Sequence, residues 1–116
     1  MLAGVLRRLK AEKIFEIKVK RYLDSVGAWY VKFFANRYTE SGIPDILACI
    51  DGHFVGVEVK AMDGKPSGLQ LSKVGQIRKA GGFAFVLYPS GFEEFKKFVE
   101  DLKQEKYNME LPVVIK

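Results

Sequence analysis

The spacing of apolar residues along the chain alternates between a helical and a strand-like pattern. Apolar side chains recur every three or four positions between residues 9 and 26, which predicts an amphipathic helix that Gly27 would end. The segments 28–35, 44–50 and 53–60 are rich in β-branched and aromatic residues, so we predict strands there. The apolar positions of the first helix are Ile14, Phe15, Val19, Tyr22, Leu23 and Val26.

The second half of the chain adds a helix, a strand and a further helix. Residues 68–80 are predicted to be helical, and Ser67 with Gln70 has the Ser-x-x-Gln spacing of a capping box at the helix start. The run "FAFVLY" at 83–88 predicts a fourth strand, and residues 91–106 a closing helix. The apolar face of the closing helix consists of Phe92, Phe95, Phe98, Val99 and Leu102. The order α-β-β-β-α-β-α predicts one α/β domain with a mixed central sheet flanked by helices.

The composition is that of a single globular domain. The chain has 116 residues, of which 48% are hydrophobic and 28% charged. The N-terminal "MLAGVLRRLK" is too short for the core of a signal peptide, and no apolar run approaches the roughly 18–20 residues of a membrane span. We therefore expect a cytoplasmic protein without membrane contact. The net charge of +5 modestly favours a nucleic-acid partner.

The few cysteine and histidine residues restrict the chemistry. Cys49 lies in an apolar run, which predicts a buried thiol and not half of a disulfide. No Cys/His cluster is present to bind zinc. His53, the single histidine, is most simply a residue flanking a turn, and its being alone excludes mechanisms that need two.

Two acidic residues lie in otherwise apolar, strand-like sequence. Asp51-Gly52 is a strong signal for a two-residue hairpin turn, and in the resulting register the numbers of paired residues sum to 103. Asp45 and Glu58 therefore face each other, at the short Cβ distance at which like charges are destabilising. Lys60 follows Glu58 by two residues, so it projects on the same face.

This trio has two interpretations. In the first, Lys60 neutralises one acid in a structural ion-pair network, although one ammonium group cannot relieve both carboxylates. In the second, Asp45 and Glu58 hold a divalent cation such as Mg²⁺, which prefers oxygen ligands. Such an ion would polarise a phosphodiester and lower the pKa of a water, and Lys60 would stabilise the developing negative charge. The second interpretation is favoured, and it predicts a metal-dependent phosphodiesterase site.

The same residues match a known signature. The pairs "PD" at 44–45 and "EVK" at 58–60 fit the PD-(D/E)xK pattern of a large nuclease superfamily with a restriction-endonuclease-like core. The surroundings agree, since a helix with glutamates precedes the hairpin and a helix and a strand follow it. Archaeal-type Holliday-junction resolvases look similar at this superfamily level.

More specifically, the chain resembles the VRR-NUC domain, the virus-type replication-repair nuclease. The resemblance rests on "GIPD" at 42–45, "VEVK" at 57–60, Gln70 and "AGG" at 80–82, and it covers roughly residues 12–95. It implies a DNA endonuclease that depends on Mg²⁺ or Mn²⁺, without a small-molecule cofactor. For stand-alone members it implies a homodimer acting on branched DNA such as four-way junctions or flaps. A phage-encoded member would work in the cytoplasm of a bacterial host.

Residue by residue, the resemblance makes Asp45 and Glu58 the metal ligands, with the backbone carbonyl of Val59 beside them, and Lys60 the catalytic lysine. The glutamate of the first helix matches Glu16 best, because of its distance from the helix-ending glycine. Glu12, one turn earlier, is the fallback. Either glutamate could instead be a solvated helix charge paired with a lysine at helical spacing.

The remaining candidates have plain alternatives. Gln70 would support the attacking water or simply cap its helix. Val74 stands where the phage-exonuclease branch has a tyrosine, which argues against a processive exonuclease. Lys32 would face the cleft and meet a phosphate, or lie exposed. A basic rim contacting DNA without reading sequence would consist of Arg37, Lys65, Lys73, Arg78 and Lys79, each of which could equally be a solvated charge.

Three hypotheses follow from the sequence. The first is a structure-selective endonuclease that uses Asp45, Glu58 and Glu16 for the metal, with Lys60 and Gln70 supporting hydrolysis. The second is a non-catalytic nucleic-acid-binding domain that keeps the nuclease fold, and the third a basic structural protein. A homodimer would use the tail "LPVVIK" at 111–116 or exposed parts of the aromatic strand.

Overall fold

The computed structural model describes residues 2–104 and 113–114, and its helices and strands follow the predicted order. Their bounds are α1 (Leu2–Ser25), β1 (Trp29–Lys32), β2 (Ile46–Ile50), β3 (His53–Val59), α2 (Gly68–Lys79), β4 (Phe83–Leu87) and α3 (Phe92–Gln104), with a 3₁₀ turn η1 (Pro89–Gly91) before the last helix. The tail proposed as a strand or partner contact, 111–116, lies outside the described residues apart from 113–114, and so do residues 105 and 106 of the predicted closing helix.

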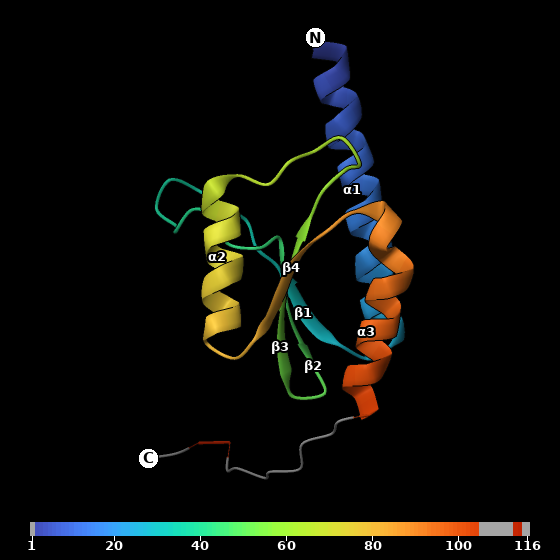
Figure 1. The fold of residues 1–116 in the computed structure, drawn as a ribbon, viewed down its shortest axis with the longest axis vertical. Helices are drawn as coiled ribbons and strands as arrows, with labels where there is room; N and C mark the ends of the chain where they lie inside the picture. The colour runs from blue at the N-terminus through green and yellow to red at the C-terminus, as the bar shows by residue number, and fades with distance from the viewer. Residues whose placement is uncertain (1, 105–112, 115–116) are drawn as a thin grey trace.

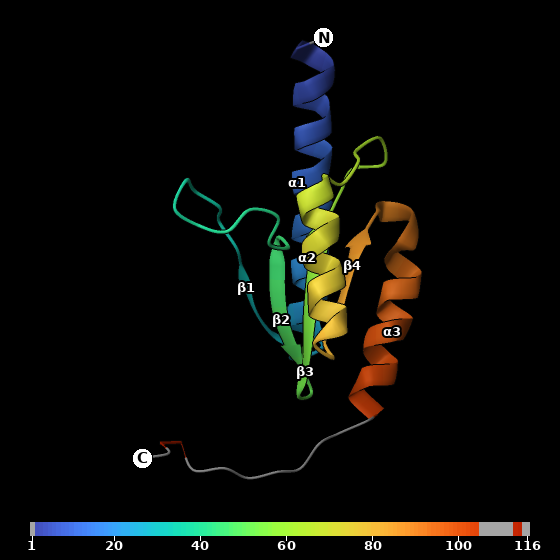
Figure 2. The same ribbon diagram turned by 60° about the vertical axis from the view of Figure 1, so that its left-hand side comes forward.

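The four strands form one mixed sheet in the order β1-β2-β3-β4. β1, β2 and β3 are antiparallel neighbours, whereas β3 and β4 are parallel and joined through α2. α2 lies on one side of the sheet, and α1 and α3 lie together on the other (Figures 1 and 2). The domain is thus an α/β sandwich of three layers.

The main core lies between the sheet and the α1–α3 layer. Alternate residues of β2 and β3 point into it because side chains alternate across a strand. Both helices contribute one apolar stripe, as the helical spacing predicts. The buried residues of this core are Phe15, Val19, Leu23, Ile46, Ala48, Ile50, Val55, Val57, Val59, Leu87, Phe92, Phe95, Val99 and Leu102.

The β2–β3 hairpin has the predicted register. Its ladder runs from Ile50 opposite His53 to Ile46 opposite Val57, and every pair sums to 103. Asp51 and Gly52 have φ values of 45° and 88°, as the two central residues of a tight hairpin turn require. Asp45, which precedes the first ladder residue, therefore lies at the open end of the hairpin.

The first helix starts earlier than predicted and ends where predicted. Residues 2 to 11 are all exposed, so this part of α1 has no buried face that an apolar pattern could reveal. At the other end Gly27 has a φ of +73°, and the N–H of Ala28 donates to the carbonyl of Leu23. This left-handed glycine and its backbone hydrogen bonds form a Schellman-type end.

The prediction that Ile14 and Cys49 are buried is wrong. Ile14 is 60% exposed, because it lies on the solvent side of α1 next to the buried Phe15. Cys49 is exposed too, since it alternates with the buried Ala48 and Ile50 and so points away from the main core. Within residues 2–104 and 113–114, no helix combines the length and apolarity that crossing a membrane requires.

Candidate active site at the open end of the hairpin

Asp45 is held from three directions where β2 begins. Its backbone carbonyl accepts from the N–H of Phe33 at 2.8 Å. Its side chain accepts from the Val59 N–H at 2.9 Å through Oδ2 and from Lys32 Nζ at 3.3 Å through Oδ1. The carboxyl group thus occupies the position of a strand partner beside the end of β3, and its orientation is fixed before any ligand arrives.

Glu58 is a buried acid, and no lysine or arginine of the described residues forms an ion pair with its carboxyl group. Its side chain is 1% exposed and hydrogen-bonds to the carboxyl group of Asp45. Burial is the largest influence on Glu58, and together with Asp45 it raises the pKa of Glu58 to about 9. Glu58 is therefore protonated at neutral pH and can donate a hydrogen bond to the carboxyl group of Asp45, which Lys32 also contacts.

Glu16 is also buried, but it is surrounded by ammonium groups. Its Oε1 accepts from Lys32 Nζ at 2.7 Å, and its Oε2 lies 3.1 Å from Lys13 Nζ and 3.2 Å from Lys20 Nζ. Burial alone would raise the pKa of this carboxyl group, but the hydrogen bonds from the lysines outweigh it and lower the pKa to about 2. Glu16 is therefore fully ionised and fully paired.

Glu12 and Lys60 belong to the same electrostatic cluster. Burial raises the pKa of Glu12; Lys60 is the strongest attractive charge acting on it, and Asp45 the strongest repulsive one. Lys60 also acts on Glu58, whose pKa it lowers against the effect of burial. Lys60 follows β3 directly, and its backbone N–H donates to the carbonyl of Leu87 at 3.0 Å. The structure thus gathers Glu12, Glu16, Asp45, Glu58 and Lys60 around the ends of β2 and β3.

A hard cation suits part of this cluster. Among the residues that the structure describes, no three His, Cys, Asp or Glu side chains are arranged to hold a metal ion. Within the same residues, however, Oε1 of Glu58 is buried and has no hydrogen-bond partner. The Val59 carbonyl faces the same space as the Val59 N–H that binds Asp45, because both groups of a strand residue point to one side. Two carboxylates and one carbonyl are oxygen ligands of the kind that Mg²⁺ and Mn²⁺ take.

Gln70 is the third helical residue of the capping box that opens α2, in which Ser67 is the N-cap. Its side-chain Oε1 accepts from the N–H of Ser67 at 2.8 Å, and its backbone N–H donates to Ser67 Oγ at 3.1 Å. This confirms the predicted capping box, and the catalytic role of Gln70 stays a prediction. The start of α2 packs on the loop before Asp45, where a Cβ on Gly42 would lie 2.4 Å from the carbonyl oxygen of Leu69.

The predicted basic rim is spread over different partners. Lys73 pairs with Glu40 at 3.2 Å, and Arg78 donates to the carbonyl of Ala84 at 2.7 Å. Arg37 lies over the ring of Tyr38 and donates to its hydroxyl group. Lys65 and Lys79 are exposed. The prediction that these residues contact DNA is not tested by these contacts.

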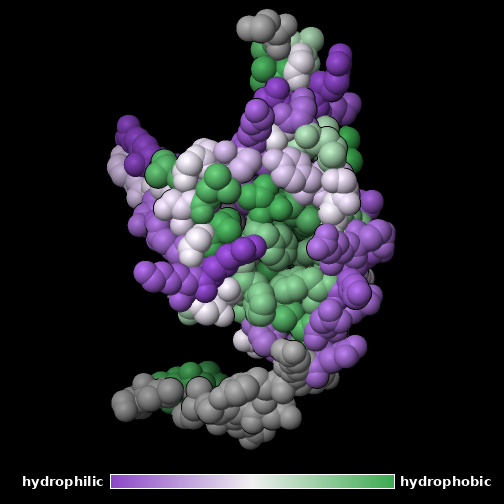
Figure 3. All heavy atoms as spheres, in the orientation of Figure 1, coloured by the Kyte–Doolittle hydropathy of each residue, from purple (hydrophilic) through white to green (hydrophobic). Residues whose placement is uncertain are grey.

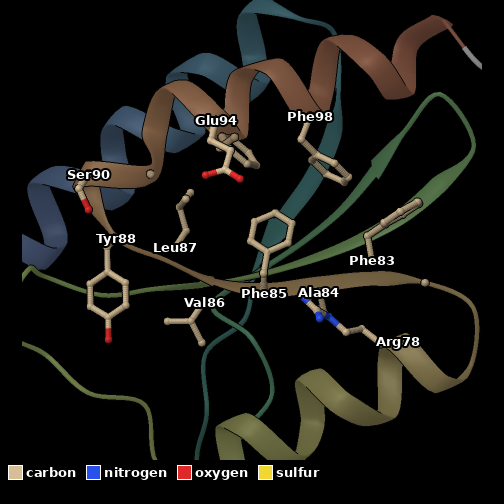
Figure 4. A pocket seen from close by; sticks show the side chains of 13 residues that line it. Arg78, Phe83, Ala84, Phe85, Val86, Leu87, Tyr88, Ser90, Glu94 and Phe98 are labelled. Carbon is tan, nitrogen blue, oxygen red and sulfur yellow. The ribbon is translucent and has the colours of Figure 1, made fainter.

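Sequence reasoning missed an apolar groove along the edge strand β4. It lies between α2 and α3 and has a volume of about 570 Å³. Phe83, Phe85 and Phe98 line the α3 side, and Arg78 lies on the α2 side (Figure 4). In Figure 3 apolar side chains gather on this face of the molecule. The sequence signal for this groove is the strand "FAFVL", which has no charged residue. It lies at an edge of the sheet, where charged residues normally prevent contact with another chain.

A second uncovered surface lies on the α2 side of the sheet. Trp29, Cys49 and Phe54 form one cross-strand row over β1, β2 and β3. Trp29 is 67% exposed and Phe54 46% exposed. Trp29 is thus an exposed residue of the aromatic strand 28–35, in which a partner surface was expected.

No family model, no curated protein and no solved structure matches this chain.

Proposed function

We propose that this protein is a divalent-metal-dependent deoxyribonuclease, an endonuclease with a VRR-NUC-like domain of the PD-(D/E)xK superfamily. The observation that carries the proposal is the contact of the buried Glu58 with the carboxyl group of the half-buried Asp45, in which Oε1 of Glu58 is buried and has no hydrogen-bond partner among the described residues. A buried carboxyl pair of this kind is unfavourable unless protonated or bound to a cation. The element order and the signature at 44–45 and 58–60 are consistent with it.

Asp45, Glu58 and the Val59 carbonyl would hold Mg²⁺ or Mn²⁺, and either Glu12 or Glu16 would complete the site. When bound, the ion would supply the positive charge that polarises a phosphodiester and makes a water more acidic. The chain itself fixes Asp45 through the Val59 N–H, at 2.9 Å, so this ligand needs no rearrangement. A preoriented ligand lowers the reorganisation that metal binding demands.

Lys60 would act on the charge that develops during cleavage. Its ammonium group already interacts with Glu58 and Glu12, so it lies within the electrostatic reach of the site. A positive charge at this position stabilises a phosphorane-like transition state and a leaving oxyanion more than the ground state. Gln70 would orient the attacking water from the start of α2.

Branched DNA is the proposed substrate, and a homodimer the proposed assembly. Two symmetric cuts in a four-way junction need two active sites related by a two-fold axis. The exposed row of Trp29, Cys49 and Phe54 offers an apolar surface for such contact. The net charge of +5 favours binding to phosphates without sequence preference.

The test is a cleavage assay on flaps, splayed arms and four-way junctions with Mg²⁺, Mn²⁺ or EDTA. We expect wild type to cut with either metal, and Asp45→Ala and Glu58→Ala to bind DNA without cutting. Asp63→Ala is the matched control, because Asp63 is an exposed acid whose partner is Arg8. Cleavage by the Asp45 or Glu58 variants at the wild-type rate contradicts the proposal. DNA binding without cleavage by wild type favours the non-catalytic alternative.

A further inference from the structure

Lys32 is the one side chain that links the acid of the helix to the acid of the hairpin among the hydrogen bonds of the described cluster. It projects from β1 toward α1 and is about one-fifth exposed. Its Nζ lies 2.7 Å from Glu16 Oε1 and 3.3 Å from Asp45 Oδ1. The sequence predicted that Lys32 contacts a phosphate in the cleft or lies exposed. Neither prediction includes this bridge between two carboxyl groups.

The two halves of the bridge are unequal. Glu16 presents both oxygens to ammonium groups, since Lys13 and Lys20 share its Oε2 while Lys32 takes its Oε1. Asp45 gives only Oδ1 to Lys32, over the longer distance, and keeps Oδ2 on the Val59 N–H. A cation that approaches Asp45 therefore meets one weak ammonium contact, whereas a cation that approaches Glu16 meets three ammonium groups.

We propose that Lys32 is the tethered counter-ion of the metal-free site, which a divalent cation displaces from Asp45 and which Glu16 retains. The inference rests on the proposed metal site. Of the two glutamates proposed to complete that site, it leaves Glu12 as the metal ligand and makes Glu16 a positioning residue that anchors Lys32. Lys32 would hold Asp45 in place without metal and would weaken metal binding, because an ammonium group and a divalent ion compete for the same carboxylate.

The direct test is Mn²⁺ binding measured by titration calorimetry without DNA, on wild type and Lys32→Met. Methionine keeps an unbranched side chain and removes the charge. We expect Mn²⁺ to bind about tenfold more tightly to the variant, at the lower end of the range over which neighbours of metal ligands change affinity. Lys96→Met is the matched control, because Lys96 is also a partly buried lysine but pairs with Glu93, outside the acid cluster. Its affinity for Mn²⁺ should equal that of wild type.

A double-mutant cycle then separates the two roles of Glu16. Glu16→Gln in the wild-type background should weaken Mn²⁺ binding, because Lys32 loses its anchor and turns to Asp45. In the Lys32→Met background the same substitution should leave the affinity unchanged. A metal ligand would instead weaken binding equally in both backgrounds, and this result would overturn the role given to Glu16.

The outcomes distinguish this inference from the proposed function. If wild type binds Mn²⁺ and cuts DNA while Lys32→Met binds Mn²⁺ no more tightly, only the role of Lys32 is overturned. If wild type binds no Mn²⁺, both proposals fail. Lys32→Arg keeps the charge and both ion pairs, so it preserves the fold should Lys32→Met not fold. It should bind Mn²⁺ no more tightly than wild type, and tighter binding would overturn the competition.

Discussion

Glu16 and Glu58 are buried acids at the two ends of one cluster, yet they are in opposite states. Glu16 is 5% exposed and Glu58 1% exposed, so burial does not distinguish them. Glu16, on α1, lies among three lysines, and its pKa is about 2. Glu58, on β3, lies against another carboxyl group, and its pKa is about 9.

Burial raises the pKa of both carboxyl groups, and the partner decides whether it prevails: the lysines outweigh burial at Glu16, whereas Asp45 adds to it at Glu58. A buried carboxyl group that is paired with lysines remains ionised. A buried carboxyl group that contacts another carboxyl group is stable only when it is protonated or bound to a cation. An added cation would therefore be bound most favourably at the Glu58 end of the cluster. This is also the end at which the signature residues Asp45 and Lys60 lie.

The largest expected effect is on cleavage. Asp45→Asn and Glu58→Gln should each lower the rate at least about 10³-fold, because they remove the charge that holds a metal worth several kcal/mol in the transition state. Glu16→Gln should lower it only about 10–100-fold, as for a residue that positions the ligands. Single-turnover rates on one junction substrate measure all three. Equal losses for Glu16→Gln and Asp45→Asn would remove the distinction between the two ends.

The two acids should give opposite slopes of stability against pH. The folded pKa of Glu16, about 2, lies below its usual 4.5, so its contribution is lost as the pH falls from about 4.5 to 2. The folded pKa of Glu58, about 9, lies above 4.5, so its contribution is lost as the pH rises from about 4.5 to 9.

Urea unfolding in EDTA across this pH range measures both slopes. In Glu58→Gln the free energy of unfolding should fall less steeply above about pH 4.5 than in wild type. In Glu16→Gln it should rise less steeply with pH below about pH 4.5. Saturating Mn²⁺ should also flatten the decline, because the ion replaces the proton on Glu58. If the free energy of unfolding of Glu58→Gln falls above pH 4.5 as steeply as that of wild type, a group other than Glu58 causes the fall.

The packing of α2 on the loop before Asp45 should depend on Gly42. Its φ is +87°, and a Cβ there would overlap the backbone of Leu69 in α2. Gly42→Ala should therefore lower the free energy of unfolding by more than the about 1–2 kcal/mol of a left-handed alanine. Gly75→Ala is the control, because Gly75 lies in α2 with nothing within 4 Å of the added Cβ. It should raise the free energy of unfolding by roughly 0.5–1 kcal/mol, and a similar loss in both variants would contradict the role of this contact.

The smallest effect is expected at the outer edge of the Glu16 end. Lys13 is exposed and pairs with Glu16 one helical turn away. Lys13→Ala should change the free energy of unfolding by about 0.5 kcal/mol or less, as exposed helix pairs do. Thermal unfolding in EDTA measures it. A loss as large as that of Lys32→Met would mean that all lysines around Glu16 hold the cluster equally.

Local sequence determined much of the fold. The Asp51-Gly52 turn set the register that brings Asp45 to the end of β3, and the capping box formed at Ser67 and Gln70 as predicted. The spacing of apolar residues placed every helix and strand of the described chain in order. These features follow from neighbours a few residues apart, whose preferences do not depend on the rest of the molecule.

Tertiary structure decided the partners of the charged groups. The rotation of α1 against the sheet pointed Glu16 toward Lys32 and brought Glu12 under the influence of Lys60. The sheet order left β4 at an edge beside an apolar groove, and the position of α2 left Cys49 exposed.

The sequence by itself determined which acids would stand at the end of the hairpin. Two of the lysines around Glu16, Lys13 and Lys20, come from its own helix. Only the packing of α1 against the sheet added Lys32 to Glu16 and so joined the helix to the hairpin, because contacts between distant segments depend on the tertiary structure.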